Sequence, residues 1–508
     1  MFVNINRKFL NIYTWDLISF ISRFGVLFVA TPFLASNPVL FGIYSLCISI
    51  SIFLNYADIG FLKASKKYAA EEFAKGSLNN ELSYLGFGTF ILFLLTIIFS
   101  IITIYISTKP ELLISNLDKN EREIAQLLLL TLSVSSVIVP FRRLAESIFK
   151  IRLDNHLFKI VNIVVSLFTL AAATIFLTND YQIVEYFLTM KILEWLGVFV
   201  AFYIIEKRYS ISFRSLLVHI NYRRGIYRKL KSLAYAGLFL MFSWIVFYEL
   251  DQIYIAKRFD AKSVSMYAIA WTFPVLLRQI FGIIYTPIVE RANHLVGDGN
   301  FVKLKELLTN VLFSTMPLTV LPAVALGLFS DILIVNWVGE DFSFSAQLAS
   351  FLSYSFVLAS VSYLMDLYLM ALEKVKFLYV SAIIPPLIFW LGLWYAHLQY
   401  GLEAIALFKM IAMFVVQGFY IYLFFHYKLH HNKFWSNWPL ILIALLAVLL
   451  VGMKPVILNI MDYLNVLDNL ILSGIIILFV LILLMLVYGI SLKYYRILIV
   501  KKLKLLFR

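Results

Sequence analysis

The chain has 508 residues, is 62% hydrophobic and only 14% charged, and carries a formal net charge of +14. Soluble domains are about 45–50% apolar and about 25% charged, so this composition excludes an ordinary water-soluble protein. Stretches of about 20 mostly apolar residues, the length that crosses the hydrocarbon core, recur from end to end. The sequence therefore predicts an all-α polytopic membrane protein.

Fourteen transmembrane helices are predicted, and the lone cysteine, Cys47, lies in the second of them as an expected small buried residue. In chain order the predicted spans are 14–35, 39–62, 84–106, 124–148, 157–178, 183–206, 233–252, 263–290, 307–330, 344–372, 377–398, 402–425, 438–459 and 470–490.

The basic residues are distributed unevenly between the two sides of these spans. With the N-terminus in the cytoplasm, the inner segments carry 30 Lys and Arg, the outer loops 7 and the spans 6, of 43 in all. Positive charge concentrates on the cytoplasmic side of membrane proteins, so the net charge reports topology and not nucleic-acid binding. Both termini are expected in the cytoplasm.

The longest inner segment, 207–232, is basic and amphipathic and is expected to lie along the lipid headgroups. It follows six spans, which suggests a joint between two halves. The predicted domains are an N-terminal six-helix lobe (1–206), this basic cytoplasmic linker (207–232), a C-terminal six-helix lobe (233–425), and a region with two extra helices and a basic cytoplasmic tail (426–508).

A weak internal repeat supports the two halves. At an offset of 223, Tyr44 aligns with Tyr267, Ala69 with Ala292 and Gly76 with Gly299. The sixth and twelfth spans match loosely, with "KIL" at 191–193 against "KMI" at 409–411. Chance similarity among apolar helices is the alternative. Together these matches favour two parallel six-helix repeats, an arrangement in which transporters commonly bind substrate between the halves.

Six cationic side chains lie inside the predicted spans, where each would cost roughly 2.5–3.5 kcal/mol if it faced lipid. They are Arg23, Arg142, Arg143, Lys191, Arg278 and Lys409. Such groups must reach the headgroups, pair with acids, or face a watery interior, and several facing one interior would form an anion-binding site.

The carboxylates near each cation in the sequence favour different roles for these residues. Arg23 and Arg278 lie near the middle of their helices without a carboxylate three or four residues away, which favours an anion-binding role over an interhelical ion pair. Lys191 and Lys409 lie at comparable depths toward the outer leaflet. Lys191 has Glu194 at i+3 and is as consistent with a structural pair. The nearest such acid to Lys409, Glu403, is six residues earlier and not on the same face.

Arg142 and Arg143 follow Pro140 in the fourth span, and Glu146 lies four residues after Arg142. An Arg142–Glu146 pair with both arginines near the headgroups is favoured there. The alternative is a cationic cytoplasmic mouth.

Four carboxylates are candidates for coupling transport to an ion: Asp58, Glu249, Asp251 and Asp366. A carboxylate in a low-dielectric environment can exchange protons at physiological pH. Solvation at the membrane surface is the simpler interpretation of each.

Several motifs are absent. The sequence has no GxxxxGK[ST] loop for ATP hydrolysis and neither HExxH nor clustered Cys and His for a metal. No cofactor is expected. The longest outer loop, 107–123, is too small for a catalytic domain, so the protein is not expected to be an enzyme.

The segments "FGIYSL…YADIGF…KKYAAEEFAKG" at 41–76 and "ELDQIYIAKRFDAKSVSMYAIAWTFP…PIVERANHLVGDG" at 249–299 carry a family resemblance. They resemble the Wzx-type O-antigen and polysaccharide flippases, in the polysaccharide transporter branch of the multidrug/oligosaccharidyl-lipid/polysaccharide (MOP) exporter superfamily. Fourteen spans are more typical of the lipid II branch, whereas many Wzx-type proteins have twelve.

The resemblance implies two six-helix lobes in a V around a cationic cavity. It implies flipping of undecaprenyl-diphosphate-linked oligosaccharide across the bacterial inner membrane, as in lipopolysaccharide biosynthesis. It maps cavity cations onto Arg23 and Arg278, and we expect these to hold the diphosphate with Lys409 assisting. Expected partners are the polyprenyl-diphosphate-linked glycan, membrane lipids, H⁺ or Na⁺ as coupling ion, and polysaccharide polymerase and assembly proteins, with no nucleic acid.

Three alternatives remain open from the sequence. One is a lipid II-type flippase. Another is a multidrug cation antiporter of the same superfamily, which would favour acidic and aromatic lumen groups over arginines. The third is a membrane polysaccharide polymerase, which would need a larger outer loop than this chain has.

Overall fold

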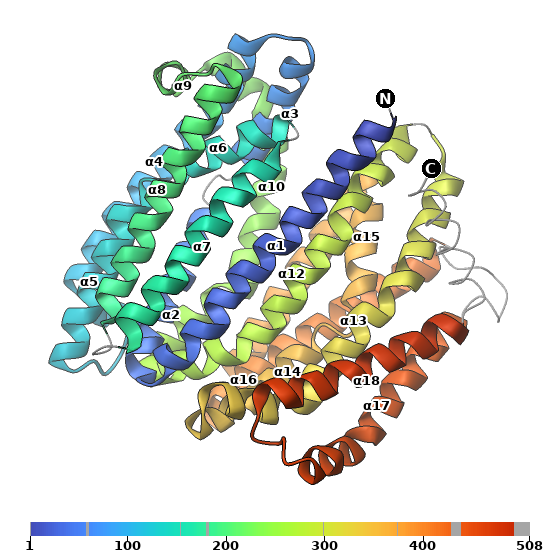
Figure 1. Cartoon of the computed structure of the whole chain (residues 1–508). Coiled ribbons are helices and arrows are strands. Elements are labelled where there is room, and N and C mark those ends of the chain that lie inside the picture. The colour runs from blue at the N-terminus through green and yellow to red at the C-terminus, as the bar shows by residue number, and fades with distance from the viewer. Residues whose placement is uncertain are drawn as a thin grey trace. The chain divides into compact units, whose positions relative to one another are not determined.

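The computed structural model is built from α-helices and two short 3-10 turns, with no strand among the residues that it describes (Figure 1). The described residues are 2–56, 60–152, 154–178, 182–297, 299–372, 374–427 and 438–491.

The chain forms two compact units, Met1–Ser265 and Met266–Arg508. The elements of the first unit are α1 (Phe2–Ala35), α2 (Pro38–Tyr56), α3 (Phe61–Ala74), α4 (Leu78–Thr108), η1 (Pro110–Leu112), α5 (Lys119–Ser136), α6 (Val139–Ile151), α7 (Asn155–Thr178), α8 (Ile183–Tyr209), α9 (Phe213–His219), α10 (Arg224–Tyr248) and α11 (Leu250–Arg258).

The helix α12 (Ala261–Gly297) begins at the end of the first unit and belongs mostly to the second. The other elements of the second unit are α13 (Phe301–Val338), η2 (Glu340–Phe342), α14 (Ser343–Tyr354), α15 (Ala359–Ala371), α16 (Val375–His426), α17 (Trp438–Tyr463) and α18 (Leu470–Ser491).

Ten helices among the described residues are long and apolar enough to cross a membrane, and two bent pairs raise the number to 12. The bent pairs are α5 with α6, at 44°, and the segments Glu340–Tyr354 and Ala359–Met370, at 43°. The all-helical, multi-pass class is therefore confirmed. The count of fourteen is not, because the predicted spans 39–62 and 233–252 are not among these helices.

The predicted second span, 39–62, is wrong at its end. The helix α2 ends at Tyr56, and the amphipathic helix α3 begins at Phe61 directly after Gly60. Gly60 has φ 75°, and a Cβ at this position would lie 2.7 Å from the carbonyl oxygen of Ala234 in α10. The turn therefore requires glycine for its left-handed backbone and for the close approach of α10.

The two candidate spans Lys376–Ala396 and Gln399–His426 share the continuous helical stretch α16. Non-helical backbone at Gly401, with φ 53° and ψ −129°, kinks this stretch near the start of the second span. The predicted gap between 398 and 402 therefore coincides with this kink, and the lone Cys47 is buried in α2 as expected, at 1% exposed.

The glycines aligned in the repeat, Gly76 and Gly299, end their helices in the same way. Gly76 N–H donates to the carbonyl of Phe73 and the next N–H donates to Glu72, at 3.0 Å each. Gly299 N–H donates to Val296 at 2.9 Å and the next N–H to Leu295 at 2.9 Å. Both glycines have positive φ, 75° and 67°. These are the two bonds of a Schellman C-cap, so the aligned glycines have one local structure.

Part of the basic segment 207–232 packs against the start of α4, within the first unit. His219 at the end of α9 contacts Asn79 at 2.8 Å, Arg223 donates to Ser83 Oγ at 2.5 Å, and Lys229 donates to Tyr84 OH at 3.2 Å. In Figure 1, α9 accordingly lies at the end of the unit where α3 leads into α4. These contacts fix the segment to one end of the unit.

Candidate functional site

A cavity of about 260 Å³ opens among α1, α6, α7 and α8 of the first unit. Its wall combines two arginines, a glutamate, an asparagine and two hydroxyls with apolar side chains. The lining residues are Arg23, Val26, Arg142, Phe158, Val161, Asn162, Val165, Ser166, Thr169, Met190, Glu194, Gly197 and Val198.

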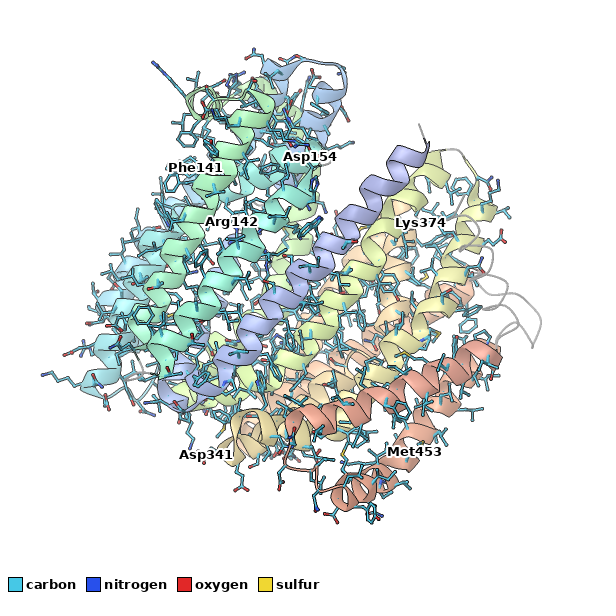
Figure 2. The ribbon with its side chains drawn as sticks, in the orientation of Figure 1. Phe141, Arg142, Asp154, Asp341, Lys374 and Met453 are labelled. Atoms are coloured by element: carbon cyan, nitrogen blue, oxygen red, sulfur yellow. The ribbon has the colours of Figure 1, made fainter. Side chains whose placement is uncertain are left out.

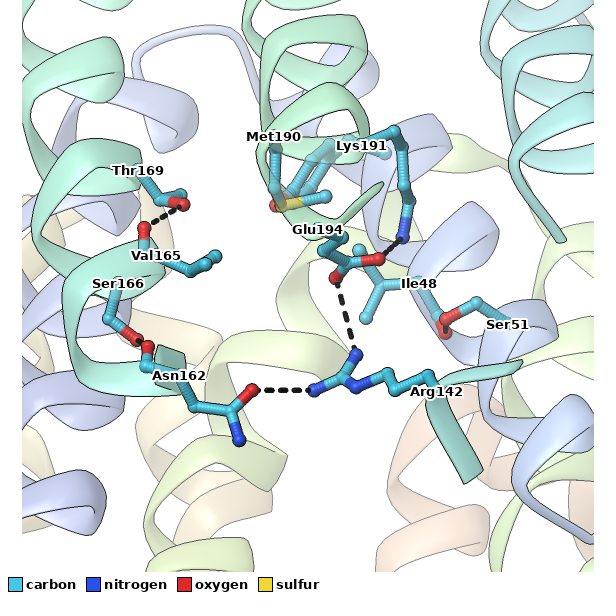
Figure 3. A network of polar contacts seen from close by, with 11 residues as sticks. Ile48, Ser51, Arg142, Asn162, Val165, Ser166, Thr169, Met190, Lys191 and Glu194 are labelled. Carbon is cyan, nitrogen blue, oxygen red and sulfur yellow. Dashed lines mark hydrogen bonds and ion pairs between the residues drawn. The ribbon is translucent and has the colours of Figure 1, made fainter. Parts of the chain in front are cut away.

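Arg142 comes from the first turn of α6, directly after the bend between α5 and α6. Pro140 suits this position because the first turn of a helix needs no amide donor there. The guanidinium contacts two helices, with Nη1 3.9 Å from Glu194 Oε1 on α8 and Nη2 donating to Asn162 Oδ1 on α7 at 3.4 Å (Figure 3). Figure 2 shows Arg142 farther than Asp154 from the end of the unit that carries α9.

Glu194 lies between two cations (Figure 3). Its Oε2 is 3.3 Å from Lys191 Nζ, one turn earlier on α8, and its Oε1 faces Arg142. The predicted i+3 pairing of Lys191 is therefore confirmed. The Lys191 ammonium also lies 5.3 Å from the centre of the Phe187 ring. Both ion-pair distances are long for charge-assisted hydrogen bonds, which are about 2.7–2.9 Å, so Glu194 is loosely held.

Arg23 reaches the same cavity from α1. It makes no hydrogen bond or ion pair with another residue that the structure describes. Arg23, Arg142 and Lys191 together carry three positive charges against the single carboxylate of Glu194. The cavity and its flank are therefore net cationic, and their planar guanidinium donors suit a phosphate or carboxylate group.

The predicted Arg142–Glu146 pair is wrong. Glu146 instead contacts Arg143 at 3.3 Å and Lys150 at 2.6 Å. Arg142 and Arg143 are adjacent and point about 100° apart around α6, so only Arg142 faces α7 and α8. Arg143 and Glu146 line a separate small cavity of about 60 Å³, together with Lys66.

The other two predicted cations belong to the second unit. Arg278 is half-buried in α12. Lys409 on α16 is fully buried and donates to Tyr267 OH at 3.1 Å, with its ammonium 4.4 Å from the centre of the Trp271 ring. Lys409 is therefore enclosed by aromatic side chains. The diphosphate-binding role of Arg278 and Lys409 stays a prediction.

Among the candidate coupling carboxylates, Asp58 lies outside the described residues. Glu249 and Asp251 flank the junction of α10 and α11 and are 5% and 1% exposed, so solvation at the membrane surface does not account for them. Asp251 accepts from the Gln252 amide at 2.8 Å. Asp366 on α15 accepts a hydrogen bond from Tyr420. Ion coupling by these groups stays a prediction.

The sequence interpretation missed the polar face of α7. Asn162, Ser166 and Thr169 all line the cavity and are spaced four and three residues apart, one face of a helix. The Asn162 amide donates to the Phe158 carbonyl at 2.9 Å, which orients its Oδ1 toward Arg142. Polar residues at helical spacing in an otherwise apolar span are a sequence signal from which this polar wall of the cavity could have been predicted.

Solved structures share the fold of this chain over most of its length. An inward closed conformation of the lipid II flippase MurJ matches with a TM-score of 0.68 at 16% identity, covering 96% of this chain and 99% of that one. An inward-facing MATE multidrug resistance transporter of the MOP superfamily matches at 0.58 and 14%, covering 82% and 94%. The chain shares the fold of these two transport proteins.

A MOP superfamily transporter from Pyrococcus furiosus, described as having a binding pocket of reverse polarity, also shares the fold of this chain. It matches with a TM-score of 0.56 at 14% identity, covering 84% of this chain and 96% of that one. No family model and no curated protein matches the sequence. The likeness to these solved structures therefore shows the fold alone, and the substrate has to be inferred from the cavity.

Proposed function

We propose that this protein is a flippase that moves undecaprenyl-diphosphate-linked oligosaccharide, an O-antigen or other polysaccharide repeat unit, across the bacterial inner membrane. The diphosphate binds in the cationic cavity of the first unit, held by Arg23 and Arg142. The glycan and diphosphate are thereby kept from the hydrocarbon, which excludes polar groups strongly. The cavity is open to the two membrane faces in turn, and an H⁺ or Na⁺ gradient biases its two states.

The observation that carries this proposal is the charge of the cavity. Two guanidinium groups from different helices, α1 and α6, line one space that also holds a single carboxylate. Positive charge within membrane spans is retained where it serves binding or transport. Arginine offers paired donors that match the oxygen atoms of a phosphate.

The MurJ likeness supports a lipid-linked substrate. It extends over 96% of this chain, whereas the two other MOP structures cover 82% and 84%. Lipid II is the substrate of that flippase, and a lipid II-type flippase is therefore the second candidate function. The resemblance of segments 41–76 and 249–299 to Wzx-type proteins favours the polysaccharide branch.

A multidrug cation antiporter is less compatible with this cavity. An organic cation would meet Arg23 and Arg142 at close range, and like charges in a low-dielectric site repel strongly. The single carboxylate, Glu194, is already engaged by Lys191 and Arg142.

Flipping of a fluorescent polyprenyl-diphosphate oligosaccharide in proteoliposomes tests the proposal. The wild type is compared with Arg23→Ala and Arg142→Ala, and we expect each variant to lose at least about tenfold in rate because it loses a charged contact to the diphosphate. Arg122→Ala is the matched control, since Arg122 is 47% exposed and pairs with Glu111 away from the cavity.

Correctly inserted arginine variants with full activity would contradict the proposed diphosphate site. Wild-type protein that flips none of several glycan donors would contradict the substrate class. That outcome would favour the multidrug exporter.

A further inference from the structure

The helices α5 and α6 form one of the two bent pairs, and the break between them lies inside the predicted span 124–148. The helix α5 ends at Ser136 and α6 begins at Val139, with a bend of 44°. The last carbonyls of a helix have no amide partner in their own helix, and Pro140 has no amide hydrogen to supply one. Within a bilayer such a break is tolerated where side chains bond the freed backbone groups. The break between α5 and α6 therefore needs polar side chains around it.

Three serines, Ser100 on α4 with Ser133 and Ser136 on α5, supply these hydrogen bonds and are called the serine cluster below. The Ser100 hydroxyl donates to the Ser133 carbonyl at 3.0 Å, and the Ser133 hydroxyl donates back to the Ser100 carbonyl at 2.8 Å. Ser136 also donates to the Ser133 carbonyl at 2.7 Å, and its hydroxyl lies 2.7 Å from Ser100 Oγ. Ser133 and Ser136 are 0% and 2% exposed. The serine cluster therefore bonds a carbonyl in the last turn of α5 and joins this end of α5 to α4.

The bent pair of the second unit is bridged in a comparable way. Its segments Glu340–Tyr354 and Ala359–Met370 meet at 43°. The carbonyl of Ser355, directly after the first segment, accepts a hydrogen bond from the Gln417 amide on α16 at 2.5 Å, and Gln417 is fully buried. In each unit, a side chain from another helix therefore bonds a backbone carbonyl at the break.

Arg142 lies six residues after Ser136, in the first turn of α6. Its guanidinium reaches across to Glu194 on α8 at 3.9 Å and to Asn162 on α7 at 3.4 Å (Figure 3). Both distances are long for polar contacts, and a displacement of about 1 Å is enough to weaken a binding group strongly. The angle at which α6 leaves α5 therefore decides how Arg142 meets the cationic cavity.

We propose that the serine cluster positions Arg142 for anion binding, because it fixes the end of α5 to α4 and so sets the angle of α6. This inference rests on the proposed function, in which Arg142 is a ligand of the diphosphate. The three serines lie outside the cavity wall and contact no ligand there. They are positioning residues that act through the arginine.

Pyrophosphate binding by the full-length protein in nanodiscs tests this role. Ser100→Ala and Ser136→Ala each remove a hydroxyl at the contact between α4 and α5, and we expect each to weaken binding at least about fivefold because Arg142 is displaced. Ser100→Thr keeps the hydroxyl and should bind as the wild type does. Ser135→Ala is the matched control. Ser135 is buried in the same turn, donates to the Leu132 carbonyl of its own helix at 3.0 Å, and makes no hydrogen bond to α4 among the described residues.

A double variant separates positioning from a general loss of structure. When Ser100→Ala is added to Arg142→Ala, pyrophosphate affinity should change by less than about twofold, because no arginine is left to position. An equal loss from Ser100→Ala with and without Arg142 would overturn the inference, since the effect would then bypass the arginine. An equal loss in Ser135→Ala would overturn it too.

Arg142→Ala alone distinguishes this inference from the proposed function. If Arg142→Ala weakens pyrophosphate binding while Ser100→Ala and Ser136→Ala bind as the wild type does, the positioning role fails and the diphosphate site stands. If Arg142→Ala itself binds pyrophosphate as the wild type does, the diphosphate site fails, and the positioning role fails with it.

Discussion

Glu194 occupies the place in the cavity where a substrate anion would have to bind. Its carboxylate contacts Arg142 at 3.9 Å and Lys191 at 3.3 Å. On the proposed function an incoming diphosphate would compete with it for these cations, so we predict that Glu194 acts as an internal counter-ion. It would reduce the repulsion among the cations in the unloaded cavity and would be displaced by a bound diphosphate.

The change Glu194→Gln tests this role. Glutamine keeps the shape and removes the competing charge, so we expect pyrophosphate to bind about tenfold more tightly, a gain of about 1.4 kcal/mol. The rate of flipping should fall because the anion leaves more slowly. Glu206→Gln is the control, an exposed glutamate on the same helix. Unchanged or weaker anion binding by Glu194→Gln would contradict the counter-ion role.

Arg152 and Glu81 form a buried ion pair. Two hydrogen bonds of 2.6 and 3.1 Å join them, and their side chains are 6% and 1% exposed. The guanidinium also lies 5.0 Å from the ring centres of Phe73 and Tyr209. Arg152→Met leaves Glu81 buried without its partner and should cost about 3–5 kcal/mol in the free energy of unfolding.

Thermal unfolding in detergent measures this loss. Adding Glu81→Met to Arg152→Met should restore much of the stability, because the orphaned charge is then gone. If the double variant is as unstable as the single one, packing by the Arg152 side chain dominates over the charge.

The element boundaries of this protein depend on both hydropathy and tertiary contact. Predicted spans such as 157–178 and 470–490 agree closely with α7 and α18, because a continuous apolar stretch is sufficient to indicate a helix across a bilayer. The end of α2 could not be predicted this way. It depends on Gly60 fitting against the backbone of Ala234, a contact more than 170 residues away in the chain that hydropathy does not encode.

Glycine substitutions can distinguish two requirements of the turn at Gly60: a left-handed backbone and room for the close approach of α10. Gly60 and Gly76 both have φ 75°, but only Gly60 has neighbours that a Cβ would meet. Gly76→Ala should therefore cost only the left-handed backbone term, about 1–2 kcal/mol. Gly60→Ala should cost clearly more, since α10 must also move. Thermal unfolding of the two variants side by side checks this, and equal losses would show that the approach of α10 contributes nothing.

At the scale of the whole molecule, composition was enough to predict the all-helical, multi-pass class, and the cationic site was predicted only in part. Arg23 and Arg142 were identified because a charge in an apolar span is conspicuous. The partner of Arg142 was assigned wrongly, because spacing along one helix favours Glu146 while the fold brings in Glu194 and Asn162 from α8 and α7. Partners on other helices depend on helix rotation and packing, which a single sequence does not state.

The orientation of the molecule in the membrane can be tested by labelling single introduced cysteines, because the chain has one cysteine of its own and that residue is buried. The single cysteine, Cys47, is 1% exposed, so the unmodified chain should react little with a membrane-impermeant maleimide. Lys119→Cys and Lys75→Cys place the same exposed substitution in a predicted outer loop, 107–123, and a predicted inner segment, 63–83. If positive charge marks the cytoplasmic side, Lys119→Cys should label in intact spheroplasts and Lys75→Cys only after permeabilisation. The reverse pattern would invert the topology, and the cavity beside Arg142 would then have to load its anion from the opposite face of the membrane.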